Sequence, residues 1–104
     1  PLTHSFKDTV KARVERDPKF REALLTEAIE QMLSGDVDVG KAVLRDYINA
    51  TVGFERLARE TGTPAKSLMR MFGPKGNPRA DNLFAVISRL QKASKIRLGV
   101  GVAR

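Results

Sequence analysis

Apolar residues recur every three or four positions along most of the chain, which is the spacing of one face of an α-helix. In the first half this pattern predicts helices over residues 5–15, 18–33 and about 37–52. The predicted apolar faces are Phe6, Val10 and Val14; Phe20, Leu24, Leu25, Ala28, Ile29, Met32 and Leu33; and Val39, Val43, Leu44, Tyr47 and Ile48. Because Tyr47 lies on its helix's apolar stripe, we expect it in the core rather than in a ligand site.

Aspartates stand where two of these helices should begin. Asp17 precedes Pro18, and an aspartate before a first-turn proline is typical of a helix N-terminus. Asp36 follows Ser34 and Gly35 and is expected to cap the next helix. Asp36 and Asp38 could instead form a carboxylate pair or a cation-binding loop, but they match no full calcium-loop pattern.

The second half of the chain is predicted to form shorter helices separated by glycine and proline. Residues 54–61 form one predicted helix, and Gly62 then permits a left-handed turn. Thr63 is expected to cap the next helix, with Pro64 at its first position. A glycine- and proline-rich loop covers residues 73–79. A last helix over residues 82–94 is predicted to be capped by Asp81 and buried through Leu83, Phe84, Ile87 and Leu90.

The C-terminal segment "IRLGVGV" alternates apolar and other residues with the period of a β-strand. A lone strand needs a partner for its backbone groups, so we expect pairing with the same strand of a second subunit. The predicted dimer residues are Ile96, Leu98, Val100 and Val102. The expected fold is all-α: five to six helices in a single domain over residues 1–104, with this short strand at the end of the chain.

Composition and charge narrow the classes of function that the chain could have. The formal net charge is +7, yet residues 1–52 hold 8 basic and 9 acidic side chains, whereas residues 53–104 hold 11 and 3. Such asymmetry is typical of a surface that meets phosphates, although a merely solubilising basic surface is the alternative.

Several function classes are not favoured. With no cysteine and one histidine, His4, the sequence predicts no metal site, no cofactor and no catalytic nucleophile–base pair, so we do not expect an enzyme. The loop "GPKGNP" lacks the ending of a phosphate-binding loop. No apolar run is long enough for a membrane span, and residues 1–11 are too polar for a signal peptide, so we expect a cytoplasmic protein.

The two short helices on either side of Gly62 suggest a helix-turn-helix, in which small Ala58 permits close approach at the crossing. If Leu68 is at the centre of the second helix's buried face, a rotation of about 100° per residue points Lys66 and Arg70 outward. Ser67 and Met69 flank this outward ridge, which suits a helix that enters the major groove of DNA. The alternative is a solvated helical hairpin that binds nothing.

The segment "LARETGTPAKSLMRMFGPKGNPRADNLFAVI" resembles the HigA-like addiction-module antidote family, which belongs to the xenobiotic-response-element regulators with a lambda-repressor-like fold. The resemblance extends over residues 20–102. It implies a dimer that binds an inverted repeat in double-stranded DNA and represses its own operon, together with a small mRNA-cleaving toxin as partner. A free-standing regulator without a toxin, and a protein-interaction module that mainly covers a toxin through residues 1–52, stay as alternatives.

By this resemblance, residues 53–95 are the DNA-binding core and residues 63–72 contain the recognition helix. The base-facing residues, from the resemblance and the outward ridge, are Ala65, Lys66, Ser67, Met69 and Arg70. Those expected near phosphates are Thr63, Lys75, Gly76, Asn77 and Arg79. The chain departs from the commonest family pattern at Pro64, which removes an amide and a hydroxyl donor near the helix start.

Overall fold

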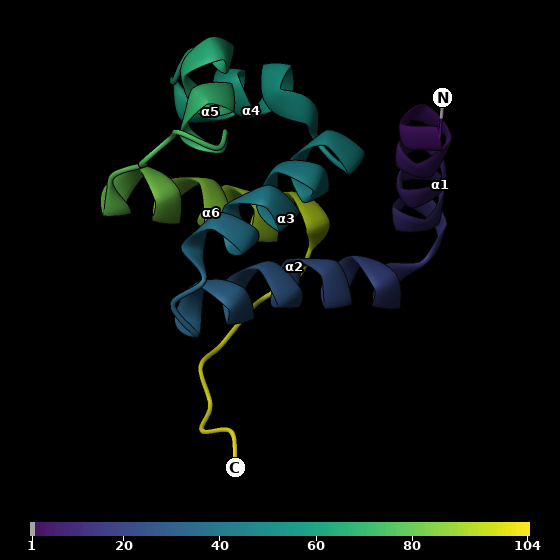
Figure 1. The fold of residues 1–104 in the computed structure, drawn as a ribbon, viewed down its shortest axis with the longest axis vertical. Coiled ribbons are helices and arrows are strands. Elements are labelled where there is room, and N and C mark those ends of the chain that lie inside the picture. Colours follow the sequence, from purple (N-terminus) through teal and green to yellow (C-terminus); the bar gives the residue numbers. More distant parts are fainter. Residues whose placement is uncertain (1) are drawn as a thin grey trace.

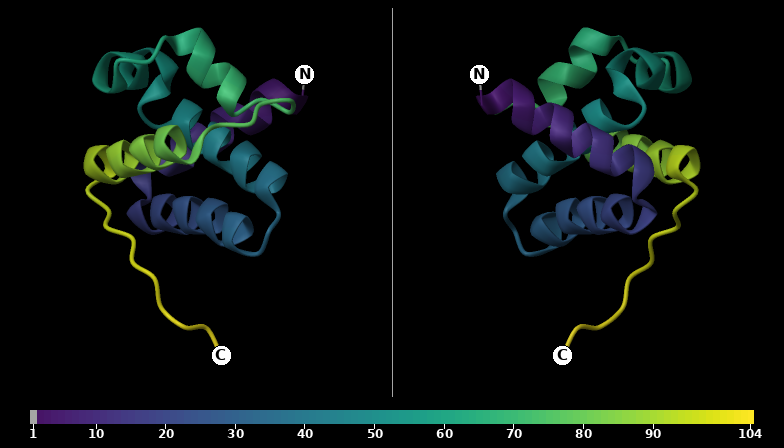
Figure 2. Two further views of the ribbon diagram at one scale, coloured as in Figure 1. Left: turned by 90° about the vertical axis from the view of Figure 1, so that its left-hand side faces the viewer. Right: turned by 90° about the vertical axis from the view of Figure 1, so that its right-hand side faces the viewer.

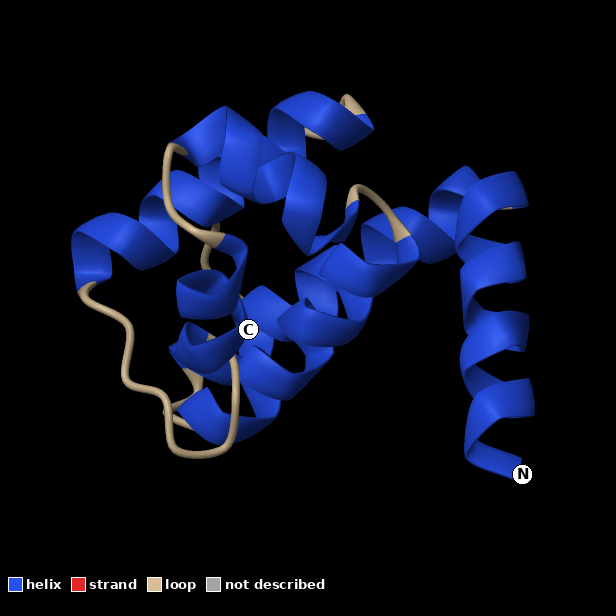
Figure 3. Ribbon diagram, turned by 90° about the horizontal axis from the view of Figure 1, so that it is seen from above, coloured by secondary structure: helices blue, strands red, loops and turns tan. Residues whose placement is uncertain are grey.

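The computed structural model describes the backbone of residues 2–104 and the side chains of residues 9–104. The described backbone forms six helices: α1 (Leu2–Arg16), α2 (Pro18–Leu33), α3 (Val37–Ala50), α4 (Gly53–Thr61), α5 (Ala65–Met71) and α6 (Ala80–Ser94). The predicted all-α fold is confirmed. The predicted C-terminal strand is wrong, because residues 95–104 follow α6 without forming a strand within this chain (Figure 3). The side chains of Phe6 and His4 lie outside the described residues.

The helix α3 crosses the middle of the molecule (Figure 1), where it contacts α1, α2 and α4. Among the described residues the α2–α3 contact is the most extensive, and α1 contacts both of these helices. The short helices α4 and α5 lie together at one end of the long axis, while the C-terminal tail leaves the molecule toward the other end (Figure 2). The radius of gyration is 13.4 Å, close to the ~13 Å of a compact domain of this length.

Two of the predicted N-caps are confirmed. The Asp17 carboxylate accepts hydrogen bonds from the backbone N–H groups of Lys19 and Phe20, at 3.1 and 3.2 Å. Asp36 accepts one from the N–H of Val39 at 3.4 Å, as an N-cap does. Each carboxylate satisfies donors that the first turn of a helix leaves unpaired. Asp36 therefore acts as a cap.

Asp81 is not the cap of α6. The helix begins at Ala80, and the N-cap position belongs to Arg79, whose extended backbone follows Pro78. Asp81 instead lies in the first turn, where its carboxylate accepts from the N–H of Asn82 at 2.9 Å. A negative charge is favourable there because the helix dipole is positive at that end.

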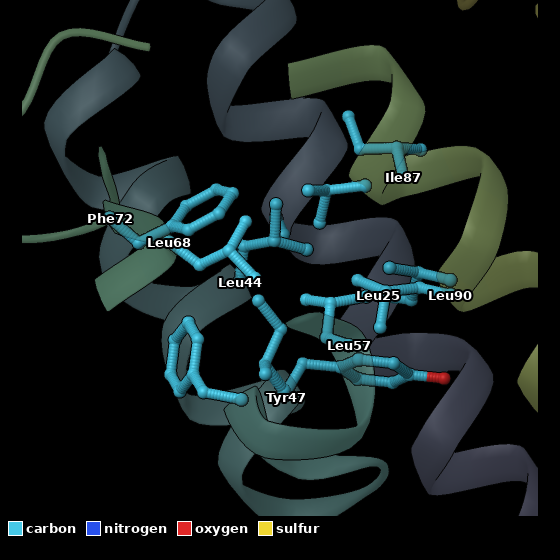
Figure 4. Close-up of a cluster of buried hydrophobic side chains, with 12 residues drawn as sticks. Leu25, Leu44, Tyr47, Leu57, Leu68, Phe72, Ile87 and Leu90 are labelled. Atoms are coloured by element: carbon cyan, nitrogen blue, oxygen red, sulfur yellow. The ribbon is translucent and has the colours of Figure 1, made fainter. Parts of the chain in front are cut away.

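Leucine is the most frequent residue in the core, and five helices each contribute one. Figure 4 shows Leu25, Leu44, Leu57, Leu68 and Leu90 converging from α2, α3, α4, α5 and α6. All five are fully buried. Burying a leucine side chain contributes roughly 1.5–3 kcal/mol, so these contacts hold the short helices α4 and α5, which are too short to be stable alone in water.

Tyr47 is a core residue, as predicted. Its ring is fully buried and its hydroxyl shares a hydrogen bond with the Ser94 hydroxyl at the end of α6. Burial raises the pKa of Tyr47, against the opposing effects of the Ser94 hydrogen bond and the Arg21 charge. The phenol therefore stays protonated through neutral pH and ties α3 to α6.

Three residues of the predicted apolar faces are exposed instead of buried: Leu33 by 71%, Val39 by 43% and Phe84 by 64%. Leu33 is the last residue of α2 and lies beyond the packed part of the α2–α3 contact. Phe84 lies ~100° around the helix from half-buried Leu83, on the side away from Val86, which is buried in its place.

None of the helices within the described part of the chain is both long and apolar enough to cross a membrane.

Two leucines of α2 offer a matched test of the core. Leu25→Ala should lower the free energy of unfolding by about 2–5 kcal/mol because it leaves a cavity in a fully buried position. Leu33→Ala, the same change on the same helix at an exposed position, should alter it by less than about 0.5 kcal/mol. Urea denaturation followed by circular dichroism measures both, and equal losses would contradict the described core.

Candidate functional site

The connection between α4 and α5 is a tight turn made possible by Gly62. Gly62 has φ 75° and ψ 10°, a left-handed conformation, and its N–H donates to the carbonyl of Ala58 at 2.9 Å. A Cβ atom at this position would meet nothing within 4 Å, so the requirement for glycine is conformational rather than steric. The predicted turn at Gly62 is confirmed, and it sets α5 at an angle to α4.

The start of α5 differs from the prediction. Pro64, with φ −57° and ψ 143°, occupies the N-cap position, and the helix begins at Ala65. No side chain caps it, so Thr63 is not the cap. Because the ψ of Pro64 is extended rather than helical, Pro64 is itself the N-cap and Thr63 lies one residue before it. The carbonyl of Pro64 accepts the first helical hydrogen bond, from the N–H of Leu68 at 3.0 Å.

The two sides of α5 differ sharply in burial. Leu68 and Phe72 are 0% and 1% exposed and face the core, whereas Lys66, Met69 and Arg70 are exposed. The helix therefore presents two cations and one thioether to the outside. The outward positions agree with the rotation of ~100° per residue counted from Leu68.

The remaining predicted base-facing residues lie at the edges of this surface. Ala65 and Ser67 are half-buried, as is Met71 on the inner side. Pro64, expected at the first position of the helix, precedes the helix and is exposed. The outward surface of α5 thus centres on Lys66, Met69 and Arg70, which we call the α5 ridge.

After α5 the chain folds back over the C-terminal end of that helix. The N–H of Gly73 donates to the carbonyl of Arg70 at 3.1 Å, and the N–H of Gly76 donates to the carbonyl of Gly73 at 3.0 Å. A Cβ atom on Gly76 would lie 2.1 Å from the Arg70 carbonyl oxygen and 2.5 Å from that of Met71. Only glycine fits there, and its amide is used within the loop.

Lys41 of α3, which the sequence analysis did not single out, holds this loop from the inside. Its side chain is only 5% exposed, and its Nζ donates to the carbonyl of Gly73 at 3.3 Å and to that of Gly76. The same ammonium is 3.5 Å from the carboxylate of Asp38. Buried lysines are rare unless they are paired, and this one is.

Arg45, one helical turn further along α3, supports the same segment. Its Nη1 donates to the carbonyl of Phe72 at 3.2 Å. Lys41 and Arg45 together bind three carbonyls at the end of α5, and we call these five groups the carbonyl clamp. Carbonyls at a helix C-terminus lack partners within the helix, so cations are favourable there.

The predicted phosphate-contacting residues are distributed along and beside this loop. Lys75, Asn77 and Arg79 are exposed, and Thr63 at the other end of α5 is half-buried. The Arg79 side chain is 81% exposed and its Nε is 3.5 Å from the Asp81 carboxylate. A surface pair of this kind contributes little and leaves Arg79 able to contact another anion.

The tail beyond α6 divides into an anchored and an exposed part. Lys95 ends α6 in a left-handed conformation, the N–H of Ile96 donates to the Gln91 carbonyl at 3.0 Å, and that of Leu98 donates to Gln91 Oε1 at 2.8 Å. The side chains of Ile96 and Leu98 pack against the core. These contacts explain why this part of the tail does not need a strand partner.

The other two predicted dimer residues have no such support. Val100 is 93% exposed and Val102 is 81% exposed. The predicted dimer set therefore separates into two residues packed on their own chain and two that are available to a partner.

Among the residues whose side chains are described, no group of three or more histidine, cysteine, aspartate or glutamate residues is arranged to hold a metal ion. No protein-family model, curated protein or solved structure matches the chain. The assignment of a function therefore depends on this geometry and on the resemblance noted in the sequence.

Gly73 and Gly76 provide a matched test of the loop. Gly76→Ala should lower the free energy of unfolding by about 1–3 kcal/mol, because the new methyl group collides with backbone oxygens that cannot move aside. Gly73→Ala should have a smaller effect, since its nearest contact would be an ordinary 3.4 Å. Urea denaturation measures both variants, and a Gly76→Ala protein as stable as Gly73→Ala would contradict the described loop.

Proposed function

We propose that this chain is a cytoplasmic DNA-binding repressor whose α4–α5 pair acts as a helix-turn-helix, with α5 entering the major groove. The observation that carries the proposal is the α5 ridge: Lys66 and Arg70 are exposed on a helix whose opposite side, through Leu68 and Phe72, is buried in the core. A helix fixed on one side and cationic on the other is suited to groove recognition.

The chemistry of the ridge agrees with base reading. An arginine can donate two hydrogen bonds to guanine, a lysine can donate to the same acceptors, and an apolar group such as the Met69 side chain can contact a thymine methyl. Arg70, Lys66 and Met69 offer these groups on adjacent turns of one short helix. Half-buried Ser67 adds a hydroxyl at the edge of the surface.

The neighbouring surface is suited to phosphate contacts. Lys75, Asn77 and Arg79 follow α5 on an exposed loop, and residues 53–104 hold the chain's whole excess of positive charge. Phosphate contacts orient a protein on the duplex while base contacts give specificity. Because the Gly76 amide is used inside the loop, we assign Gly76 to shaping the loop.

A second candidate function is protein binding, as expected of an antitoxin. At the turn between α2 and α3, Leu33, Val37 and Val39 are exposed by 71%, 47% and 43%. Asp36 and Asp38 lie among them and are exposed as well. An apolar surface bordered by acidic side chains fits a basic protein partner. This surface belongs to the nearly neutral half of the chain, so the two functions are compatible.

The test of DNA binding begins with selection of a preferred duplex from a random library, because the operator sequence is unknown. Lys66→Ala and Arg70→Ala should each weaken binding to the selected duplex by about 1–3 kcal/mol, the value of a lost base contact. Binding to random duplex should fall less. Affinity should also decrease with salt, with a log–log slope of about −0.9 per neutralised phosphate.

Lys11→Ala is the control for these variants, because it removes one exposed cation from α1. It should leave the preference for the selected duplex unchanged. If Lys66→Ala and Arg70→Ala bind that duplex as the wild type does, α5 is not the recognition helix. If no duplex is enriched, the chain is not a sequence-specific DNA-binding protein.

The proposed repressor acts as a homodimer, because two recognition helices reach successive major grooves about 34 Å apart on one face of the duplex. The tail leaves the body at the end away from α5, so contacts between tails keep both α5 ridges open (Figure 1). Val100 and Val102 are the exposed apolar residues of this tail.

Deletion of residues 99–104 should therefore yield a folded monomer with weaker binding to the selected duplex. The truncation leaves Ile96 and Leu98 in place, so the core is retained. Analytical ultracentrifugation measures the mass, and circular dichroism checks the helices. A truncated protein that is still a dimer would assign the interface to the helices.

A further inference from the structure

We infer that Lys41 is a positioning residue for the α5 ridge: its buried ammonium fixes the loop at the end of α5 and thereby orients Arg70 and Lys75. The consequence for DNA rests on the function proposed above. The effect on the loop does not, and it is measured without DNA.

The ammonium of Lys41 has its partners within the protein. It donates to the carbonyls of Gly73 and Gly76, and it lies 3.5 Å from the carboxylate of Asp38, whose side chain is exposed. With its side chain only 5% exposed, the group is not available to a phosphate. Its removal would therefore take no direct contact away from bound DNA.

The clamp joins segments that are far apart in the sequence. Lys41 is 32 residues before Gly73 and 35 before Gly76, so the contact couples α3 to the loop rather than closing a local turn. The next cation on the same side of α3, Arg45, binds the carbonyl of Phe72 at 3.2 Å. Buried Leu44 lies between Lys41 and Arg45 in α3, so the core holds in place the helix that carries both cations of the clamp.

The loop in turn determines where the outward cations lie. Gly76 sits directly against the carbonyls of Arg70 and Met71, and Lys75 is its neighbour in the chain. A displacement of Gly76 therefore moves Lys75 and releases the last turn of α5, which carries Arg70. The Asp38 side chain is 89% exposed, so its ion pair with Lys41 adds little stability. The two carbonyl contacts therefore favour fixing one loop geometry as the role of Lys41.

The first test measures the loop directly by limited digestion with trypsin. Lys41→Met keeps an unbranched four-atom stem and removes the ammonium. Cleavage after exposed Lys75 should become about tenfold faster relative to cleavage after exposed Arg97, because local opening exposes the loop to the protease. Lys11→Met, which removes an exposed charge from α1, is the matched control and should leave this ratio unchanged.

The second test measures the effect on DNA with the selected duplex and a random one. Lys41→Met should weaken binding to the selected duplex about tenfold, as when a base contact is misplaced. Binding to random duplex should change by less than about threefold, because the exposed cations remain. Lys11→Met should keep the wild-type ratio of the two affinities.

The outcomes separate the inference from the proposed function. Unchanged cleavage after Lys75 in a folded Lys41→Met protein overturns the inference, as does a loosened loop with unchanged binding to the selected duplex. Equal losses on both duplexes would assign Lys41 a general charge effect and overturn it too. If the wild type binds no duplex specifically, the proposed function is wrong. Faster cleavage after Lys75 in Lys41→Met would still support the role of the clamp in fixing the loop. If Lys41→Met does not fold, Arg45→Met tests the same clamp with an expected two- to threefold faster cleavage.

Discussion

The packing of α3 inside the helical array is the constraint on which the rest of the structure depends. Leu44, Tyr47 and Ile48 are fully buried in one cluster with side chains of α2, α4, α5 and α6. The Tyr47 hydroxyl ties α3 to α6, while Lys41 holds the loop after α5. A rotation of α3 about its axis would break all of these contacts together, so its register determines the position of α5.

The sequence predicted the features that depend on near neighbours. The caps at Asp17 and Asp36 and the left-handed turn at Gly62 each need only residues within four positions, and the structure confirms them. Capping was wrong at Thr63 and Asp81, because α5 begins one residue later than predicted and α6 two residues earlier. In both places the extended backbone of another residue, Pro64 or Arg79, takes the N-cap position.

Features that depend on distant residues could not be predicted in the same way. A lysine on an amphipathic helix normally lies in solvent, and nothing near Lys41 in the sequence indicates carbonyls more than thirty residues later. Likewise the alternation of apolar residues in the tail predicted a strand. Instead, Gln91 accepts hydrogen bonds from the N–H groups of Ile96 and Leu98, and the side chains of both residues pack against the core. The outward direction of Lys66 and Arg70 was predictable because helical rotation alone determines it.

The candidate site is therefore held in place by buried residues that are not part of its exposed surface. Seven residues of α5 cannot form a stable helix alone, so burial of Leu68 and the carbonyl clamp of α3 hold it. The exposed side chains of Lys66 and Arg70 contribute nothing to that support, so other side chains can replace them without loss of the fold. The contacts that stabilise α5 and the surface proposed to bind DNA thus lie on opposite sides of one short helix, and the position of both depends on α3.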